Sequence, residues 1–212
     1  TAVLIYDLRT GALAHIVNFA AQGLVRAGGG GIHRMRQSPK TGLVYGVTGP
    51  GVNLFELDPV VGKLTRTKAL GDIVGTGLAA DFAAGRLYYQ SGFSDDLYEI
   101  DLATFEVLRT LEGEVHGRRL ALDRRRRVLY VAGYFSGSLA ALDLDSGERV
   151  WSLPIGPRPQ GMDLVDDALW VNTQDGLFEV TLPTAWSHFG FTDARFFPSK
   201  HRIPFVYDPV DP

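Results

Sequence analysis

The sequence contains no cysteine among its 212 residues. Disulfide scaffolds and thiolate metal sites are therefore excluded, because no thiol is present to form either. No apolar run approaches the roughly 18 residues that a membrane-spanning helix needs. The net charge of −3 provides no positive field over the whole chain, so we do not expect nucleic acid as a partner.

What is present is enough apolar sequence for one domain with a core of its own, since 45% of the residues are hydrophobic. The sequence begins at Thr1 rather than Met. We therefore expect either a processed chain or part of a longer one. The lack of cysteine fits an oxidising compartment, although it does not require one.

Two short sequence motifs recur along the chain with matching periods, which is the strongest signal in the sequence. The first motif contains an aspartate, and these aspartates are 51, 43 and 42 residues apart: Asp7, Asp58, Asp101 and Asp143. The second motif ends in an aromatic residue, and these residues are 43, 42 and 40 positions apart: Tyr45, Tyr88, Tyr130 and Trp170. Glu179–Leu182 is a weaker fifth copy of the first motif.

Each repeat predicts four short strands. In the clearest copy these are Arg119–Asp123, Val128–Ala132, Ser138–Asp143 and Arg149–Ile155, separated by charged and Gly-rich turns. A four-stranded unit of about 42 residues cannot bury both of its faces alone. Copies packed radially can do so, and that arrangement is a β-propeller.

We therefore predict an all-β fold, a β-propeller with about four to five visible blades. By this count the chain starts at the third strand of a blade, contains three complete blades, and ends with three strands and a tail. The blades are expected over residues 1–184, and an aromatic- and Pro-rich C-terminal extension over 185–212. The strand count fits either an incomplete arc that is part of a longer propeller, or a compact five-bladed ring that the tail completes.

The segment Val128–Met162 resembles the YVTN-type bacterial propeller repeat, with its Tyr-Val pair, Gly-rich turn, apolar strand into Asp, and Pro-x-Gly. More distantly, Asp143–Trp151 is similar to the repeat of quinoprotein propellers. The YVTN resemblance implies a bacterial protein of the periplasm or cell surface. The likeness extends loosely to lactone-hydrolysing and quinoprotein propellers, which implies an enzyme or ligand binder as the alternative.

A cationic cluster is predicted at one end of the central channel. Aligning the first strands of three repeats without gaps places His33, Thr76 and Arg118 at one position. First strands line the channel, so six residues are expected at its mouth: His33, Arg34, Arg36, His116, Arg118 and Arg119. Arginine offers a fixed fork of donors that suits a carboxylate or phosphate. The interpretation that we favour is instead that these residues pair with acids around a water-filled channel.

The C-terminal extension is predicted as a partner-binding segment or as a cap on the propeller itself. It gathers seven aromatic residues: Trp186, Phe189, Phe191, Phe196, Phe197, Phe205 and Tyr207. A disordered tail would not carry so many. An exposed aromatic cluster of that size would mark a partner site.

The other motifs in the sequence do not indicate catalysis or metal binding. The run Arg124–Arg127 occupies a predicted turn, where a solvated hairpin tip is favoured over a site for an acidic partner. The five histidines lack the spacing of a zinc motif, and neither Gly-x-Ser-x-Gly nor a phosphate loop is present. We therefore expect no metal, cofactor or catalytic residue.

Two functions from different classes remain. The favoured one is a non-catalytic scaffold or recognition subunit that binds other protein subunits in a bacterial envelope complex. The alternative is an enzyme or binder of a small anionic ligand at the cationic mouth, with His33 or His116 transferring a proton.

Overall fold

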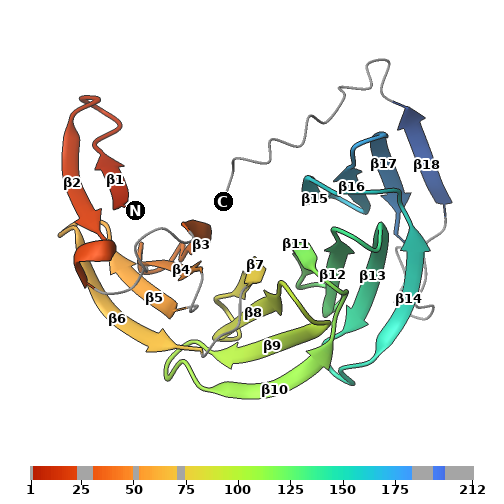
Figure 1. Ribbon diagram of the computed structural model, residues 1–212, viewed down its shortest axis with the longest axis horizontal. Helices are drawn as coiled ribbons and strands as arrows, with labels where there is room; N and C mark the ends of the chain where they lie inside the picture. Colours follow the sequence, from red (N-terminus) through yellow and green to blue (C-terminus); the bar gives the residue numbers. More distant parts are fainter. Residues whose placement is uncertain (1, 23–30, 50–52, 71–74, 183–192, 199–212) are drawn as a thin grey trace.

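The computed structural model describes residues 2–22, 31–49, 53–70, 75–182 and 193–198. Apart from a three-residue 3₁₀ turn, Ala20–Gln22, the regular structure in these ranges is β-strand. The strands form one two-stranded and four four-stranded antiparallel sheets, arranged as an open arc (Figure 1). The all-β propeller fold predicted from the repeats is therefore confirmed.

We call these sheets blades 1 to 5. Blade 1 contains β1 (Ala2–Tyr6) and β2 (Leu13–Asn18). Blade 2 contains β3 (Ile32–Gln37), β4 (Val44–Thr48), β5 (Asn53–Asp58) and β6 (Lys63–Ala69). Blade 3 contains β7 (Gly75–Asp81), β8 (Arg86–Ser91), β9 (Asp96–Asp101) and β10 (Val107–Glu112).

Blade 4 contains β11 (Gly117–Asp123), β12 (Val128–Gly133), β13 (Ser138–Asp143) and β14 (Arg149–Pro154). Blade 5 contains β15 (Gly161–Val165), β16 (Ala168–Asn172), β17 (Gly176–Thr181) and β18 (Asp193–Pro198). The last strand, β18, comes from the segment 185–212 that the sequence sets apart as an extension. It pairs with β17 over six residues and gives blade 5 its fourth strand.

Each four-stranded blade runs from the inside of the arc to the outside in chain order. The first strands, β3, β7, β11 and β15, lie on the inner side, and the fourth strands lie on the outer side (Figure 1). Along the inner side, β7 contacts both β3 and β11, and β11 contacts β15. The inner strands of four blades therefore share one concave surface.

The repeated aspartates form the turn between the third and fourth strand of a blade. Their Oδ1 atoms accept backbone N–H bonds from the residue two positions on, at 2.8 Å for Asp7 and Asp58, 3.0 Å for Asp101 and 2.7 Å for Asp143. An aspartate side chain that accepts hydrogen bonds from turn amides in this way explains why the aspartate motif recurs.

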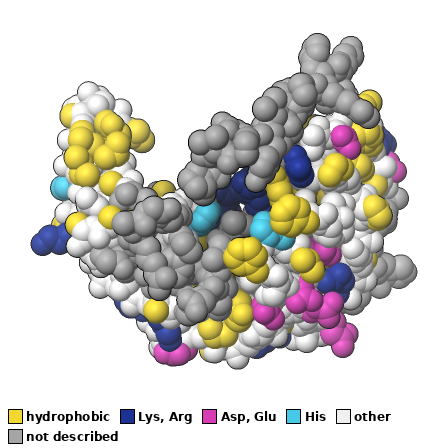
Figure 2. Space-filling model, in the orientation of Figure 1, with side chains coloured by type: hydrophobic (Ala, Val, Ile, Leu, Met, Phe, Trp, Pro, Cys, Tyr) yellow, Lys and Arg dark blue, Asp and Glu magenta, His cyan; other side chains and the backbone are white. Residues whose placement is uncertain are grey.

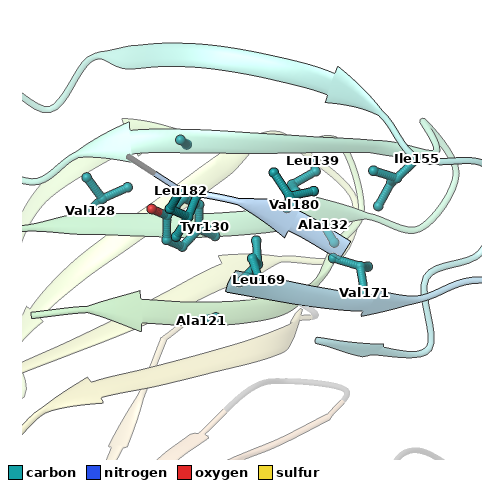
Figure 3. Packing of buried hydrophobic residues seen from close by; sticks show 11 residues of the cluster. Ala121, Val128, Tyr130, Ala132, Leu139, Ile155, Leu169, Val171, Val180 and Leu182 are labelled. Atoms are coloured by element: carbon teal, nitrogen blue, oxygen red, sulfur yellow. The ribbon is translucent and has the colours of Figure 1, made fainter. Parts of the chain in front are cut away.

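The repeated aromatics form the core, which lies between blades rather than inside them. Tyr45, Tyr88 and Tyr130 each belong to a buried cluster shared with the following blade. A fourth cluster joins blade 1 to blade 2 around Phe55. Figure 3 shows the cluster between blades 4 and 5, where Tyr130 and Leu139 meet Val180 and Leu182. Each blade therefore needs a neighbour on both sides to bury its apolar surface.

Polar contacts repeat between the same blades. A side chain near the middle of the fourth strand contacts the next blade, at the turn between that blade's third and fourth strands. We call the place of this side chain on its strand the bridge position. His15 bonds the Val60 carbonyl oxygen at 2.9 Å. Arg66 donates to the Leu102 carbonyl at 2.8 Å, and Arg109 donates to the Leu144 carbonyl.

Candidate functional site

The six cationic residues predicted at the channel mouth lie on or beside two inner strands. His33, Arg34 and Arg36 are on β3, Arg118 and Arg119 are on β11, and His116 immediately precedes β11. All six side chains are half-buried. In the space-filling view, Lys, Arg and His side chains gather around the hollow in the centre of the face (Figure 2).

Two of these residues lie at β-bulges. The pairing register shifts between Ile32 and Arg34 in β3, and between Gly117 and Arg119 in β11. The extra residues are His33 and Arg118. The same shift occurs at Thr76 in β7, so the gap-free alignment of the sequence identified one structural position in three blades. A bulged residue leaves the ladder, which is how bulges redirect a side chain.

The inner strands β3 and β11 both pack against β7, and charges on the two outer members of this trio influence one another. Burial lowers the pKa of His33, and the charges of Arg34 and Arg118 lower it further. The pKa of Arg34 is also lowered, by burial first and then by Arg118 and Arg36. We call His33, Arg34 and Arg118 the mouth cluster.

The mouth cluster has no acidic partner among the described residues. None of its three side chains forms an ion pair with an Asp or Glu in those ranges. Arg34 donates to the His33 carbonyl at 2.7 Å, and the Arg118 guanidinium lies 4.6 Å from the ring centroid of Tyr134. Unneutralised cations in a half-buried site raise one another's energy, and an anion relieves this cost.

Aromatic side chains border the mouth cluster. The ring of His116 lies 4.4 Å from that of Phe135, 5.9 Å from that of Tyr134 and 6.2 Å from that of Phe93. We call these four residues the aromatic rim. Burial lowers the pKa of His116, and Arg118 adds to this, while a hydrogen bond with the Gly92 backbone opposes it.

Two members of the rim, Phe93 and Phe135, were missed by the sequence analysis. They are 75% and 68% exposed and lie in equivalent loops after the second strands of blades 3 and 4. Their spacing of 42 residues is in step with the repeat, and this was the signal available. Both are large apolar side chains exposed to solvent next to the mouth cluster, and exposed apolar groups of this kind are typical of recognition surfaces.

The remaining two predicted residues interact with blade 5. Arg119 donates through Nε to the carbonyl of Gln160 in the loop before β15. Arg36 is influenced by the charge of Asp163 on β15. The acid nearest to His116 in sequence, Glu114, is 3.2 Å from Arg149 and accepts a hydrogen bond from Ser138 at 2.5 Å. The structure therefore separates the six residues into a mouth group and two others.

Arg36 borders a cavity of about 490 Å³ on the concave side of the arc. Its walls come from the inner strands of blades 2 to 5, and its charged lining residues are Arg36, Arg124 and Asp163. Arg124 is itself 3.5 Å from Asp81. This volume falls in the range of small-molecule sites, roughly 300–1,000 Å³.

The arginine run Arg124–Arg127 forms the turn between β11 and β12, as predicted, and Arg124 and Arg125 are exposed there. The run is more than a solvated tip, because each of its side chains lies beside an acid. Arg126 is buried, pairs with Asp123 at 2.5 Å and also binds Asp167 of blade 5. Arg127 lies 3.7 Å from Asp81 of blade 3 and 3.2 Å from Asp145. The run joins three consecutive blades, and four adjacent cations are tolerated because acids from neighbouring turns surround them.

Of the seven aromatic residues predicted to bind a partner, two fall within the described ranges. Phe196 and Phe197 lie on β18, 44% and 47% exposed. Phe196 packs against Phe178 with ring centroids 4.6 Å apart, and Phe197 stacks on Trp170 at 6.2 Å. The other five lie outside the described residues: Trp186, Phe189, Phe191, Phe205 and Tyr207.

Within the described ranges, no three or more His, Asp or Glu side chains come together as a metal site would require. In the same part of the chain, no helix is long and apolar enough to cross a membrane.

The fold and the repeated blades define a β-propeller-type protein. A chain of Kuenenia stuttgartiensis hydrazine synthase has a similar fold, with a TM-score of 0.67 and 14% sequence identity. The match covers 82% of this chain and 51% of that one, so this chain spans about half the length of its structural relative. At this identity the likeness concerns the fold alone. No protein-family model matches the sequence, and no curated protein matches it either.

Proposed function

We propose that this protein is a recognition scaffold whose channel mouth binds an acidic segment of a partner protein. The observation that carries the proposal is the mouth cluster. His33 and Arg118 occupy the same bulge position on two inner strands that pack against β7, and the cluster has no acidic partner among the described residues. The aromatic rim lies next to it and offers exposed apolar surface. Carboxylates bind the arginine forks, and apolar side chains between them pack on the rim.

A peptide suits this surface better than an isolated ion. The exposed phenylalanines, Phe93 and Phe135, come from two different blades, and Arg34 comes from a third. A ligand that used all of them would extend across the mouth of the arc. The proposal involves binding alone and no chemical step.

The test uses a fluorescein-labelled hexaglutamate peptide and measures anisotropy at low salt. We expect binding that weakens as salt rises, because the attraction is between partly exposed charges. Arg118→Gln should weaken it about tenfold or more, since a charge-assisted hydrogen bond contributes about 1.5–3 kcal/mol. Arg9→Gln is the matched control, because Arg9 is an exposed arginine already paired with Asp7.

Equal affinity of the Arg118→Gln and Arg9→Gln variants would contradict the proposal. A labelled hexalysine peptide provides a second control and should not bind the mouth.

We propose the bacterial periplasm or cell surface as the location of the protein. This rests on the resemblance of Val128–Met162 to the YVTN-type repeat and on the absence of cysteine. More specifically, we propose that the protein is a subunit of a complex in the bacterial envelope. Fractionation of the source cells tests the location, and recovery of the protein in the cytoplasm would exclude both the location and the complex.

A second candidate function is binding of a small anionic ligand inside the arc. The observation in its favour is the cavity of about 490 Å³ with Arg36 and Arg124 in its lining. Calorimetric titration with citrate distinguishes the two candidates. Arg36→Gln should abolish citrate binding in the cavity and leave hexaglutamate binding at the mouth unchanged. If Arg118→Gln instead weakens the binding of both citrate and hexaglutamate, small anions bind at the mouth as well.

A further inference from the structure

The bridge position is occupied in blade 5, although no described blade follows it. In blades 2 and 3 the bridging arginine is paired across the strands with a glutamate, Glu56 with Arg66 at 2.7 Å and Glu99 with Arg109 at 2.5 Å. In blade 5 the same register position holds Glu179 opposite Arg195. Blade 4 is the exception, because Ala141 and Trp151 stand there.

Arg195 therefore has the surroundings of a bridge without the turn that a bridge contacts. Its side chain is largely exposed and bonds Asp193 at 2.9 Å on its own strand. The hydrogen bond and the charge of Asp193 raise the pKa of Arg195, and the charge of Glu179, its cross-strand neighbour, raises it further. Arg66 and Arg109 have such partners too, and they additionally bond a carbonyl of the next blade.

The apolar positions around this pair also lack their cover. Leu54, Leu97 and Leu139 are fully buried against the following blade. The equivalent residue of blade 5, Leu177, is 36% exposed. Phe197, its neighbour across the strands, is also exposed. The face of blade 5 that points away from blade 4 is thus one half of an inter-blade interface.

Blade 1 exposes the other half. Val3 and Ile5 face blade 2, so Leu4, Tyr6 and Ile16 face the opposite way. These three side chains are 51%, 51% and 61% exposed. The positions equivalent to Tyr6 in blades 2 to 5 are buried against the preceding blade: Leu57, Ile100, Leu142 and Val180.

We propose that blade 5 of one molecule packs on blade 1 of a second copy, head to tail, through the same interface that joins consecutive blades within the chain. Arg195 of the first copy donates to a carbonyl in the turn after β1 of the second, as Arg66 and Arg109 do within the chain. Leu177 and Phe197 cover Leu4, Tyr6 and Ile16. The two ends of one arc lie on opposite sides of its opening (Figure 1), so one molecule does not bring them together. This surface is separate from the channel mouth.

A head-to-tail contact joins two different surfaces, and this makes it testable by mixing. Phe197→Asp blocks one surface and Ile16→Asp blocks the other. Each variant alone should stay monomeric in sedimentation equilibrium, while the wild-type chain associates as its concentration rises. An equimolar mixture should form a dimer of twice the monomer mass and nothing larger, because only one intact surface remains on each molecule.

Leu108→Asp is the matched control, since Leu108 is 49% exposed on the outer strand of blade 3, away from both ends. It should associate like the wild type. Far-UV circular dichroism confirms that each variant is folded, and Arg195→Gln replaces Phe197→Asp should the latter fail to fold. A wild-type chain that stays monomeric up to its solubility limit overturns the proposal. So does a mixture that forms no dimer, or a single variant that associates as the wild type does.

Discussion

At the residue scale, the site depends on what the bulges do to single side chains. His33 and Arg118 could be selected from the sequence because three inner strands align without gaps, and the structure places both at the same bulge. The interactions of Arg36 and Arg119 with blade 5 could not be predicted. They involve Asp163 and Gln160, whose distance from β3 and β11 is set by the curvature of the arc.

Two glycines of blade 2 allow a prediction about this local packing. A Cβ at Gly46 would lie 2.4 Å from Phe55 Cζ and 2.9 Å from the Arg34 carbonyl oxygen, whereas a Cβ at Gly49 would meet only the His33 ring, at 2.7 Å from Nε2. Gly46→Ala should therefore lower the free energy of unfolding by about 1–3 kcal/mol, as overpacking does. Gly49→Ala should cost less, because the imidazole can rotate away. Urea unfolding measures both, and equal losses would contradict the packing described.

The pH dependence of binding follows from the histidines. The pKa values of His33 and His116 in the free protein are lowered by burial and by Arg118. A bound carboxylate favours the protonated imidazole and so raises both pKa values. Affinity for hexaglutamate should therefore increase as pH falls through the interval between the bound and free pKa values, and level off below the free values. Anisotropy titrations at several pH values measure this, and an affinity that falls between neutral and mildly acid pH would contradict it.

At the element scale, a blade is incomplete without its neighbours. The strands and turns of blade 4 could be predicted almost to the residue, because alternation, β-branched runs and Asp-led turns agree there. The strand β18 was not predicted, since a segment rich in aromatics and proline carries no alternation. Its residues become a strand through the free edge of β17, which is a tertiary cause.

The bridge position yields a prediction for blade stability. Arg109 links buried Glu99 to the Leu144 carbonyl of blade 4, so Arg109→Gln should destabilise the fold by about 1–2 kcal/mol. Arg195→Gln changes the same position in blade 5, where the side chain is exposed. At concentrations where the chain is monomeric it should leave the midpoint of unfolding almost unchanged, because the side chain is exposed. Thermal or urea unfolding compares the two, and a larger loss for Arg195→Gln would mean that the position does not act as described.

At the scale of the whole molecule, the arc creates both proposed surfaces. Its concave side carries the cations of β3 and β11, and among the described residues its two ends expose apolar side chains at positions that are buried between the other blades. The repeat predicted the propeller and the incomplete count of strands. The inter-blade role of Arg124–Arg127 could not be predicted, because Asp81 and Asp167 are distant in sequence and meet the run only when consecutive blades pack.

The most direct test of the recognition role is a titration of the ¹⁵N-labelled chain with unlabelled hexaglutamate, followed by amide chemical shifts. The Phe197→Asp variant keeps the protein monomeric for this measurement. The account predicts shifts at the starts of β3 and β11 and in the loops that hold Phe93 and Phe135, with little change on β17 and β18. Shifts centred on the outer strands, or none at saturating peptide, would contradict it.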